Sequence, residues 1–213
     1  MESKTINTWN NVVKNASESY KEYFKEEEKF LRNNISKKDV VLDIGCGTGR
    51  TILTISSISK KVIGIDNDED AVQRGKENIK DLKNTEIFLE DAEKTHFGDN
   101  AFDIIFIGLT FVNFGETKFK ILNEINRILK DNGKLIFSVY NENALEERLK
   151  IYKRDDKDLK IEKNGKVIFS FGQETISEQF SEEEITQILN ESGFKISEIK
   201  KGGIFYLIKA QKR

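Results

Sequence analysis

Three glycines, Gly45, Gly47 and Gly49, lie within five residues at the end of an apolar run in the segment VVLDIGCGTGR, residues 40–50. Glycine loses more conformational entropy on folding than any other residue, so such a cluster indicates a sharp bend and the close approach of another group. A strand, a glycine loop and a helix in this order are typical of the ligand-binding turn of an open parallel sheet. We expect Thr48 to cap the helix that follows the loop.

Strand-like apolar runs alternate with amphipathic stretches through most of the chain. This alternation is the pattern of βα units and predicts an α/β fold with a largely parallel sheet. We expect strands at residues 39–45, 61–66, 85–90, 102–108 and 133–140.

The clearest predicted helix covers residues 116–133 and ends at a turn from Asp131 to Gly133. Its apolar positions recur at helical spacing. They are Phe119, Leu122, Ile125 and Leu129.

The last third of the chain differs in composition. Residues 144–160 are rich in charges of both signs and indicate a solvated helix or loop. Residues 159–171 predict a β-hairpin that turns at Asn164–Gly165. Residues 181–193 predict a helix, because a serine and early glutamates favour its start and a glycine favours its end. Residues 194–211 predict an antiparallel strand pair.

Acidic residues follow three consecutive predicted strands at the edge where the glycine loop lies. Asp43 precedes the first glycine by two residues, Asp66 ends the second strand, and Asp91 follows the third. A carboxylate at Asp43 repels a pyrophosphate and attracts a cationic group. Asp66 is spaced to accept from ribose hydroxyls, and Asp91 can accept from an exocyclic amine. The three acids together favour an adenosine ligand with a positive end and no phosphate.

The segments VLDIGCGTGR, VIGIDNDEDAV, IFLEDAEKTHF, FDIIFIGLTFVNF and LKDNGKLIFSVYN occur in this order. Over residues 38–140 the chain resembles the class I, Rossmann-like S-adenosylmethionine-dependent methyltransferases, and FSEEEITQILNESGF with FYLIKA resembles their last helix and strand pair. The resemblance implies a doubly wound, seven-stranded, mostly parallel sheet with an antiparallel C-terminal strand and helices on both faces. One departure is LKDNG, where the family often has LKPGG.

The resemblance also implies roles for individual residues. Asp43 and the loop residues would approach the methionine part of S-adenosylmethionine, Asp66 the ribose, and Asp91 the adenine amine. The backbone of Asn67 and of Ala92 would flank the adenine ring. The implied cofactor-binding residues are Asp43, Gly45, Cys46, Gly47, Gly49, Asp66, Asn67, Asp91, Ala92, Gly108 and Leu109.

We expect one methyltransferase domain over residues 1–213. Its predicted parts are an N-terminal helical segment (1–37), the cofactor-binding core (38–140), a substrate-cap segment with the hairpin (141–180), and the last helix and strand pair (181–213). The N-terminal helix either packs against the domain edge or acts as a lid.

The expected reaction is methyl transfer by in-line displacement, which requires alignment more than a universal catalytic residue. No catalytic residue is assigned; Tyr140, Asn113 and His96 are candidates, although a surface or packing role is the simpler interpretation of His96. We interpret Cys46 as a small residue that fits a tight loop. The candidate residues of the acceptor pocket are Trp9, Tyr20, Thr110, Phe111, Asn113, Phe114, Tyr140 and Asn141.

A small-molecule acceptor is the leading hypothesis. The alternatives are a tRNA or protein acceptor, docked by a basic region with Lys150, Lys153, Arg154 and Lys157, and a non-catalytic cofactor-binding subunit. The net charge of −2 argues against a surface built throughout to neutralise phosphates.

One cysteine and one histidine argue against a disulfide framework and a cysteine-based zinc site, so no metal is expected. No apolar run is long enough to cross a bilayer, and the N-terminus lacks the apolar stretch of a secretory signal. These features predict a cytoplasmic monomer or homodimer without a membrane partner.

Overall fold

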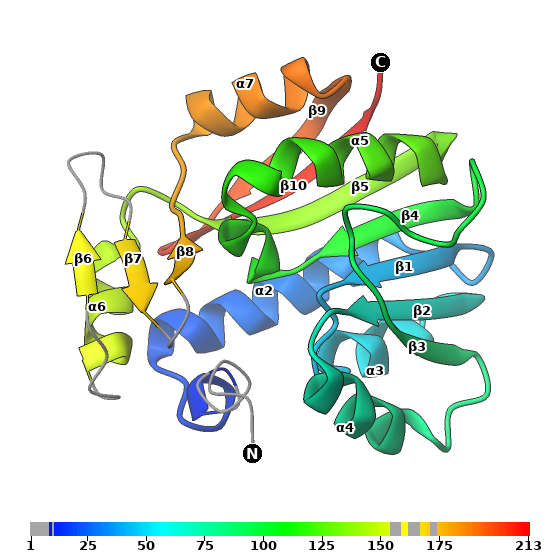
Figure 1. Ribbon diagram of the computed structural model, residues 1–213, viewed down its shortest axis with the longest axis horizontal. Coiled ribbons are helices and arrows are strands. Elements are labelled where there is room, and N and C mark those ends of the chain that lie inside the picture. Colours follow the sequence, from blue (N-terminus) through cyan, green and yellow to red (C-terminus); the bar gives the residue numbers. More distant parts are fainter. Residues whose placement is uncertain (1–8, 10, 154–158, 162–166, 171–173) are drawn as a thin grey trace.

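The computed structural model describes residues 9, 11–153, 159–161, 167–170 and 174–213. Its central element is a seven-stranded sheet with the order β3-β2-β1-β4-β5-β10-β9 (Figure 1). Six strands run in one direction and β10 runs antiparallel to both of its neighbours, which confirms the predicted fold class. The strands are β1 (Val40–Ile44), β2 (Lys61–Asp66), β3 (Thr85–Leu89), β4 (Phe102–Ile107), β5 (Leu129–Tyr140), β9 (Phe194–Lys201) and β10 (Phe205–Lys212).

The strand order reverses between β1 and β4, the point at which an open parallel sheet forms its ligand-binding crevice. The chain moves outward from β1 through β2 to β3, then returns to β4 and moves the other way to β5. Because crossovers between parallel strands are right-handed, helices α3 and α4 cover one face of the sheet and α5 covers the other (Figure 1). Ligands of such sheets bind at the carboxyl ends of the strands beside the reversal. The helices are α3 (Arg50–Ser56), α4 (Glu69–Ile79), α5 (Lys118–Ile128) and α7 (Glu182–Glu191).

The central strands are apolar on both sides because helices cover both faces of the sheet. Val41, Ile105 and Ile136 from three neighbouring strands have no exposed surface. Burial of such a side chain stabilises the fold by roughly 1.5–3 kcal/mol. The rigid centre of the sheet thus carries the loops at its carboxyl edge.

The predicted boundary between α5 and β5 is wrong. The helix ends at Ile128 and β5 begins at Leu129, so the turn predicted from Asp131 to Gly133 lies inside the strand. Leu129 pairs with Phe102 and Lys134 with Ile104, so a bulge takes up the intervening residues. Phe119 is also 41% exposed, because the buried face of α5 starts with Lys118.

The predicted N-terminal helix is divided. Residues 11–14 are helical, the chain bends at residues 15–17, and α2 (Glu18–Asn34) follows. Helix α2 packs Tyr23 against Phe205 of β10, with ring centroids 5.3 Å apart. Residues 1–8 and 10 lie outside the described part of the chain.

The cap segment contains α6 (Leu145–Lys153) and a small antiparallel sheet of β6 (Leu159–Ile161), β7 (Val167–Ser170) and β8 (Glu174–Ser177). The antiparallel pairing of β6 with β7 agrees with the predicted hairpin, although its turn at Asn164–Gly165 lies outside the described residues. Strand β8 was not expected from the sequence.

The predicted C-terminal elements are confirmed. Ser181 and Glu184 form a reciprocal capping box at the start of α7, and Gly193 follows its end with φ of 78°. At the turn between β9 and β10, a Cβ on Gly202 would lie 2.1 Å from the Phe205 ring, so only glycine fits there. In the described part of the chain, no helix has the length and apolar character needed to span a membrane.

Candidate functional site

The glycine loop bends as its sequence predicts. Gly45, Gly47 and Gly49 have φ angles of 70°, 54° and 87°, in the left-handed region that favours glycine. The amides of Gly45 and Cys46 both donate to the Ile65 carbonyl, at 2.8 and 3.1 Å, so the loop is held to the end of β2. The residue that caps α3 is Gly49, without a side-chain hydrogen bond, so the expected cap at Thr48 is wrong.

Two close contacts restrict the loop to small residues. A Cβ on Gly45 would lie 2.3 Å from the Thr110 side chain, and a Cβ on Gly64 would lie 2.7 Å from the Cys46 Sγ. Burial is the largest cause that raises the pKa of the Cys46 thiol, so the thiol is a neutral packing group. Above Gly47, by contrast, an added Cβ would meet no atom within 4 Å, so the loop backbone borders open space at this point.

Asp66 connects the end of β2 to the glycine loop. Its Oδ2 accepts from the Gly47 amide at 2.8 Å and its Oδ1 from the Asp68 amide at 3.0 Å. Burial raises the pKa of the carboxyl, and these two backbone donors oppose that rise. The carboxylate therefore lies beside the loop backbone, and its predicted role in binding the ribose stays a prediction.

Asp43 is 1% exposed and accepts from the Thr51 Oγ1 at 2.5 Å. Burial raises its pKa to about 7, the Thr51 hydrogen bond opposes this rise, and the nearby Glu27 charge adds to it. Asp43 thus titrates close to neutral pH beneath the loop.

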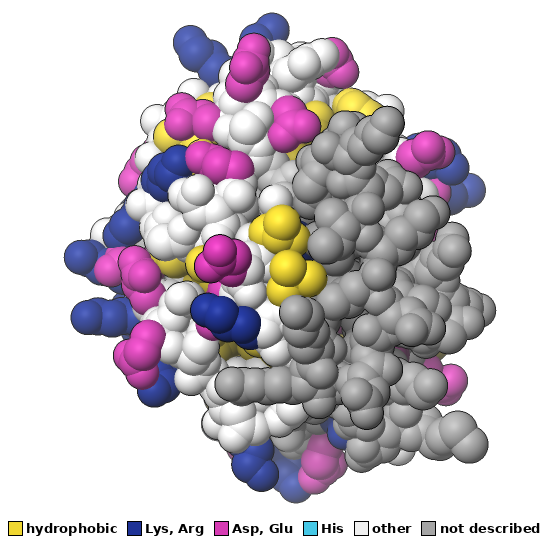
Figure 2. Space-filling view, turned by 90° about the vertical axis from the view of Figure 1, so that its left-hand side faces the viewer, with side chains coloured by type: hydrophobic (Ala, Val, Ile, Leu, Met, Phe, Trp, Pro, Cys, Tyr) yellow, Lys and Arg dark blue, Asp and Glu magenta, His cyan; other side chains and the backbone are white. Residues whose placement is uncertain are grey.

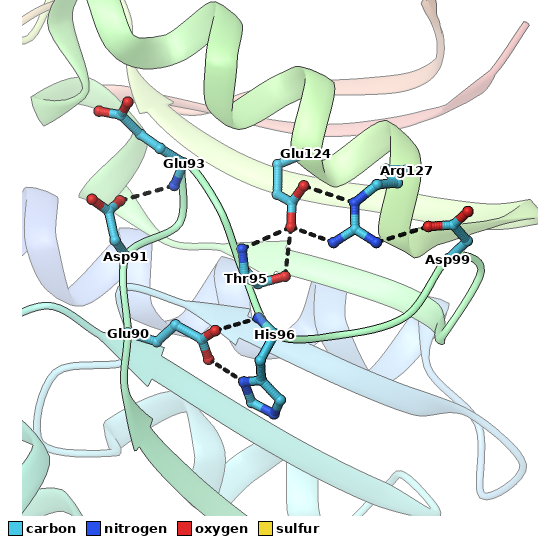
Figure 3. Close-up of polar contacts among 8 residues, drawn as sticks. All are labelled: Glu90, Asp91, Glu93, Thr95, His96, Asp99, Glu124 and Arg127. Atoms are coloured by element: carbon cyan, nitrogen blue, oxygen red, sulfur yellow. Dashed lines mark hydrogen bonds and ion pairs between the residues drawn. The ribbon is translucent and has the colours of Figure 1, made fainter.

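Asp91 and His96 lie on the connection from β3 to β4 (Figure 3). The exposed Asp91 accepts from the Glu93 amide at 2.9 Å through Oδ1. His96 is 57% exposed and its Nδ1 lies 2.7 Å from the Glu90 Oε2. Both contacts are local, and they define the shape of the connection beside the predicted adenine position.

The same connection is attached to α5 by a charged network (Figure 3). The Glu124 Oε1 accepts from the amide and the hydroxyl of Thr95, at 2.8 and 2.6 Å. Arg127 donates to both Glu124 and Asp99. Burial would raise the pKa of Glu124, but the bonds from Arg127 and Thr95 lower it to about 2.

A second charged network joins α2 to the glycine loop, and sequence reasoning did not find it. Glu27 is 1% exposed and its Oε2 accepts from Arg50 Nη2 at 2.6 Å. The Tyr23 hydroxyl also donates to Glu27 and lies 2.8 Å from the Ser138 Oγ of β5. Burial, and then the Glu27 charge, raise the pKa of Tyr23. The available signal was the spacing of Glu27, four residues after Tyr23 on the apolar face of the helix.

Among the acceptor candidates, three aromatic side chains form one cluster. The Tyr20 and Tyr140 hydroxyls lie 2.6 Å apart, and Trp9 packs edge-on against Tyr20 with centroids 6.4 Å apart. The guanidinium of Arg148, a fully buried residue of α6, lies 4.5 Å from the centroid of the Tyr140 ring. The N-terminal helix, β5 and the cap therefore meet at Tyr140.

The remaining acceptor candidates occupy different environments. Phe111 is fully buried against Phe114, Phe137 and Phe180, so it forms core. Asn141 is also fully buried, and its side-chain amide donates to carbonyls of the β9–β10 turn. Asn141 therefore stabilises this turn and does not line a pocket.

The residues after β4 form two short 3₁₀ helices, η1 (Leu109–Asn113) and η2 (Gly115–Thr117). Leu109 is buried, Gly108 is half-buried and Asn113 is exposed. The three catalytic candidates thus lie in separate places, with Tyr140 bonded to α2, Asn113 on η1 and His96 on the β3–β4 connection.

A buried ion pair attaches the cap to the segment after β4. The Lys118 Nζ lies 2.7 Å from the Glu178 Oε2, with both side chains at most 10% exposed. The Glu178 amide also donates to the Val112 carbonyl at 2.7 Å. The sequence offered no signal for this pair, because the two residues are 60 positions apart.

Curated relatives match part of the chain. A probable cobalt-precorrin-6B C(15)-methyltransferase (decarboxylating) of Methanococcus maripaludis strain C7 is 39% identical over 120 residues, which cover 55% of this chain and 60% of that protein. A demethylmenaquinone methyltransferase of Staphylococcus saprophyticus is 31% identical over 130 residues, which cover 60% of this chain and 54% of that protein. The chain thus spans less than two thirds of the length of these relatives.

Solved structures share the fold. The PH0226 protein from Pyrococcus horikoshii superposes with a TM-score of 0.73 at 22% identity over 93% of both chains. A SAM dependent methyltransferase from Aquifex aeolicus superposes with a TM-score of 0.71 at 22% identity over 100% of both chains. A family model described as a methyltransferase domain matches residues 35–193, well over half of the chain. The chain therefore belongs to the methyltransferase-domain family.

Proposed function

We propose that the protein is an S-adenosylmethionine-dependent methyltransferase that methylates a small molecule. The observation that carries this proposal is the bond from the Gly47 amide to Asp66, which places a carboxylate beside the open backbone of the glycine loop. The residues fit the cofactor: the loop backbone at Gly47 borders open space, and Asp66 and Asp91 offer acceptors for hydroxyls and an amine. The acids at the same edge favour a cationic ligand over a phosphate.

When bound, S-adenosylmethionine supplies a methyl group on a positively charged sulfur with a good leaving group. The chain then has to hold the acceptor in line with that group and exclude water. The family resemblance implies that the methionine end would lie at the glycine loop and at Gly108 and Leu109. The cap and Tyr140 lie at the same edge of the sheet and are the proposed walls of the acceptor pocket.

A small-molecule acceptor is supported by the names of both curated relatives, which refer to a precorrin and to demethylmenaquinone. The charge of the cap side gives further support. On its described surface, basic and acidic side chains are interspersed (Figure 2). Lys150 lies 3.6 Å from Glu147. In the predicted polymer-docking region, Arg154 and Lys157 and the side chain of Lys153 lie outside the described residues.

The cofactor assignment is tested by calorimetry with S-adenosylhomocysteine. Asp66→Ala should weaken binding by about 1–3 kcal/mol, because it leaves the Gly47 amide and the ligand without their acceptor. Asp81→Ala is the matched control, since Asp81 is exposed on the connection before β3. Preference of the wild type for NAD over S-adenosylhomocysteine would refute the assignment.

The acceptor is tested with methyl-labelled S-adenosylmethionine and separate pools of metabolites, tRNA and protein. Label in a metabolite supports the small-molecule proposal, and label in tRNA or protein replaces it with the polymer alternative. If no pool is labelled although S-adenosylhomocysteine binds, the non-catalytic subunit becomes the better description.

A further inference from the structure

Helix α2 contributes a buried carboxylate to the carboxyl edge of the sheet. The Glu27 Oε2 accepts from Arg50, which is the first residue of α3 after the glycine loop. The Glu27 Oε1 lies 3.8 Å from the position that a Cβ on Gly108 would occupy. Glu27 therefore lies between the loop after β1 and the backbone after β4, the two segments that border the crevice.

The charges around Glu27 are unbalanced. Glu27 and Asp43 are each 1% exposed, and Arg50 is the cation that interacts with both. When both carboxyl groups are ionised, they share one guanidinium and favour an additional positive group nearby, because burial removes the screening by water. A ligand with an ammonium group would supply that charge.

Arg50 has binding capacity that its protein contacts do not use. A guanidinium carries five N–H donors, and among the described residues Arg50 donates to Glu27 alone. The guanidinium also lies 4.7 Å from the centroid of the Phe24 ring, which restrains its position. Its side chain is 32% exposed, so part of the guanidinium remains accessible. Such a group binds a carboxylate well.

We propose that Glu27 and Arg50 recognise the amino-acid end of the cofactor, Glu27 by accepting from its ammonium group and Arg50 by donating to its carboxylate. This assignment rests on the proposed function. Asp66 and Asp91 serve the adenosine end, so the two ends are recognised by different elements. Helix α2 thereby becomes part of the cofactor site rather than a support at the domain edge.

The test compares two ligands that differ only at the amino-acid end. S-adenosylhomocysteine carries it, whereas 5′-methylthioadenosine keeps the adenosine and the thioether sulfur without it. Glu27→Gln should lower the affinity for S-adenosylhomocysteine about 10- to 100-fold and leave that for 5′-methylthioadenosine within about twofold. Arg50→Gln should give the same difference. Asp66→Asn should weaken both ligands by similar factors.

The matched control is Glu26→Gln. Glu26 is the neighbouring residue and attaches α2 to the edge strand β9 through Lys200. Its replacement therefore tests helix attachment alone and should leave both affinities unchanged. Thermal unfolding of each variant verifies folding, and if Glu27→Gln does not fold, Arg50→Gln decides.

Equal loss of both ligands in Glu27→Gln, or loss of neither, would overturn the assignment. Equal affinity of the wild type for both ligands would also overturn the assignment, although the proposed function would stand. A wild type that binds neither ligand refutes the proposed function itself.

Discussion

Two charged networks flank the carboxyl edge of the sheet, and they use the same kinds of residues in opposite ways. In the first, Glu27 and Asp43 are buried around Arg50, where α2 meets the glycine loop. In the second, Glu124 and Arg127 attach the β3–β4 connection to α5, and Arg127 is 37% exposed (Figure 3). The guanidiniums are similarly exposed, since Arg50 is 32% exposed, so the networks differ in their carboxylates. Those of the first network are 1% exposed, whereas Glu124 is 10% exposed and Asp99 72% exposed.

This difference in burial indicates different tasks. Buried ion pairs contribute little to stability, since the loss of hydration offsets the attraction, and strongly shifted titrations concentrate at functional sites. Hydrogen bonds from a backbone amide to a partly exposed carboxylate stabilise a loop modestly. We therefore expect the buried network to govern ligand binding and pH dependence, and the exposed network to govern the conformation of the connection.

The largest expected effect concerns Asp43. Burial raises its pKa from 3.8 to about 7, so between these values the folded state holds a proton that the unfolded state releases. The free energy of unfolding should therefore decrease as the pH rises through this window, by on the order of 3 kcal/mol between pH 4.5 and 8. Asp43→Asn should remove this slope in urea unfolding measured across the range.

Asp131→Asn is the control for Asp43, because Asp131 is 88% exposed in the β5 bulge and should leave the slope unchanged. If the free energy of unfolding depended on pH in the same way in the wild type and in Asp43→Asn, Asp43 would be ionised throughout this range. The two networks would then not differ in their pH dependence.

An intermediate effect is expected for Glu124→Ala. The variant leaves the amide and the hydroxyl of Thr95 without their acceptor, so the free energy of unfolding should fall by about 1–3 kcal/mol. Glu77→Ala is the comparison, since Glu77 forms an exposed ion pair with Lys80. Urea unfolding measures both. If Glu124→Ala weakened S-adenosylhomocysteine more than Glu27→Gln does, the contrast between the networks would be wrong.

The smallest effect is expected for His96→Ala. The His96 side chain, which contacts Glu90, is 57% exposed, and polar contacts of such exposed side chains contribute about 0–1 kcal/mol. Stability should change by less than about 0.5 kcal/mol and cofactor affinity should stay the same. Once an acceptor is identified, a large loss of kcat in His96→Ala with unchanged stability would instead identify His96 as a catalytic residue.

The sheet and the position of its crevice could be predicted because they depend on local signals. Buried strands appear as branched apolar runs, and the three loop glycines mark backbone conformations that other residues rarely adopt. The α5–β5 boundary was predicted wrongly, because Asp131 to Gly133 have turn chemistry that the strand accommodates as a bulge. Pairing with β4, which is remote in sequence, prevails over this local preference.

Within the site, the sequence by itself determined which residues end the strands: the glycine loop with Asp43, Asp66 and Asp91. Only the tertiary structure decided which other groups join them. Glu27 lies in a run of three glutamates, and only the packing of α2 on the sheet separates it from its exposed neighbour Glu28. Similarly, Asn141 was a candidate pocket residue by position, but its amide is used by the β9–β10 turn. Residues distant in sequence meet through long-range packing, and an acidic or amide side chain carries no local signal of the partner that will bury it.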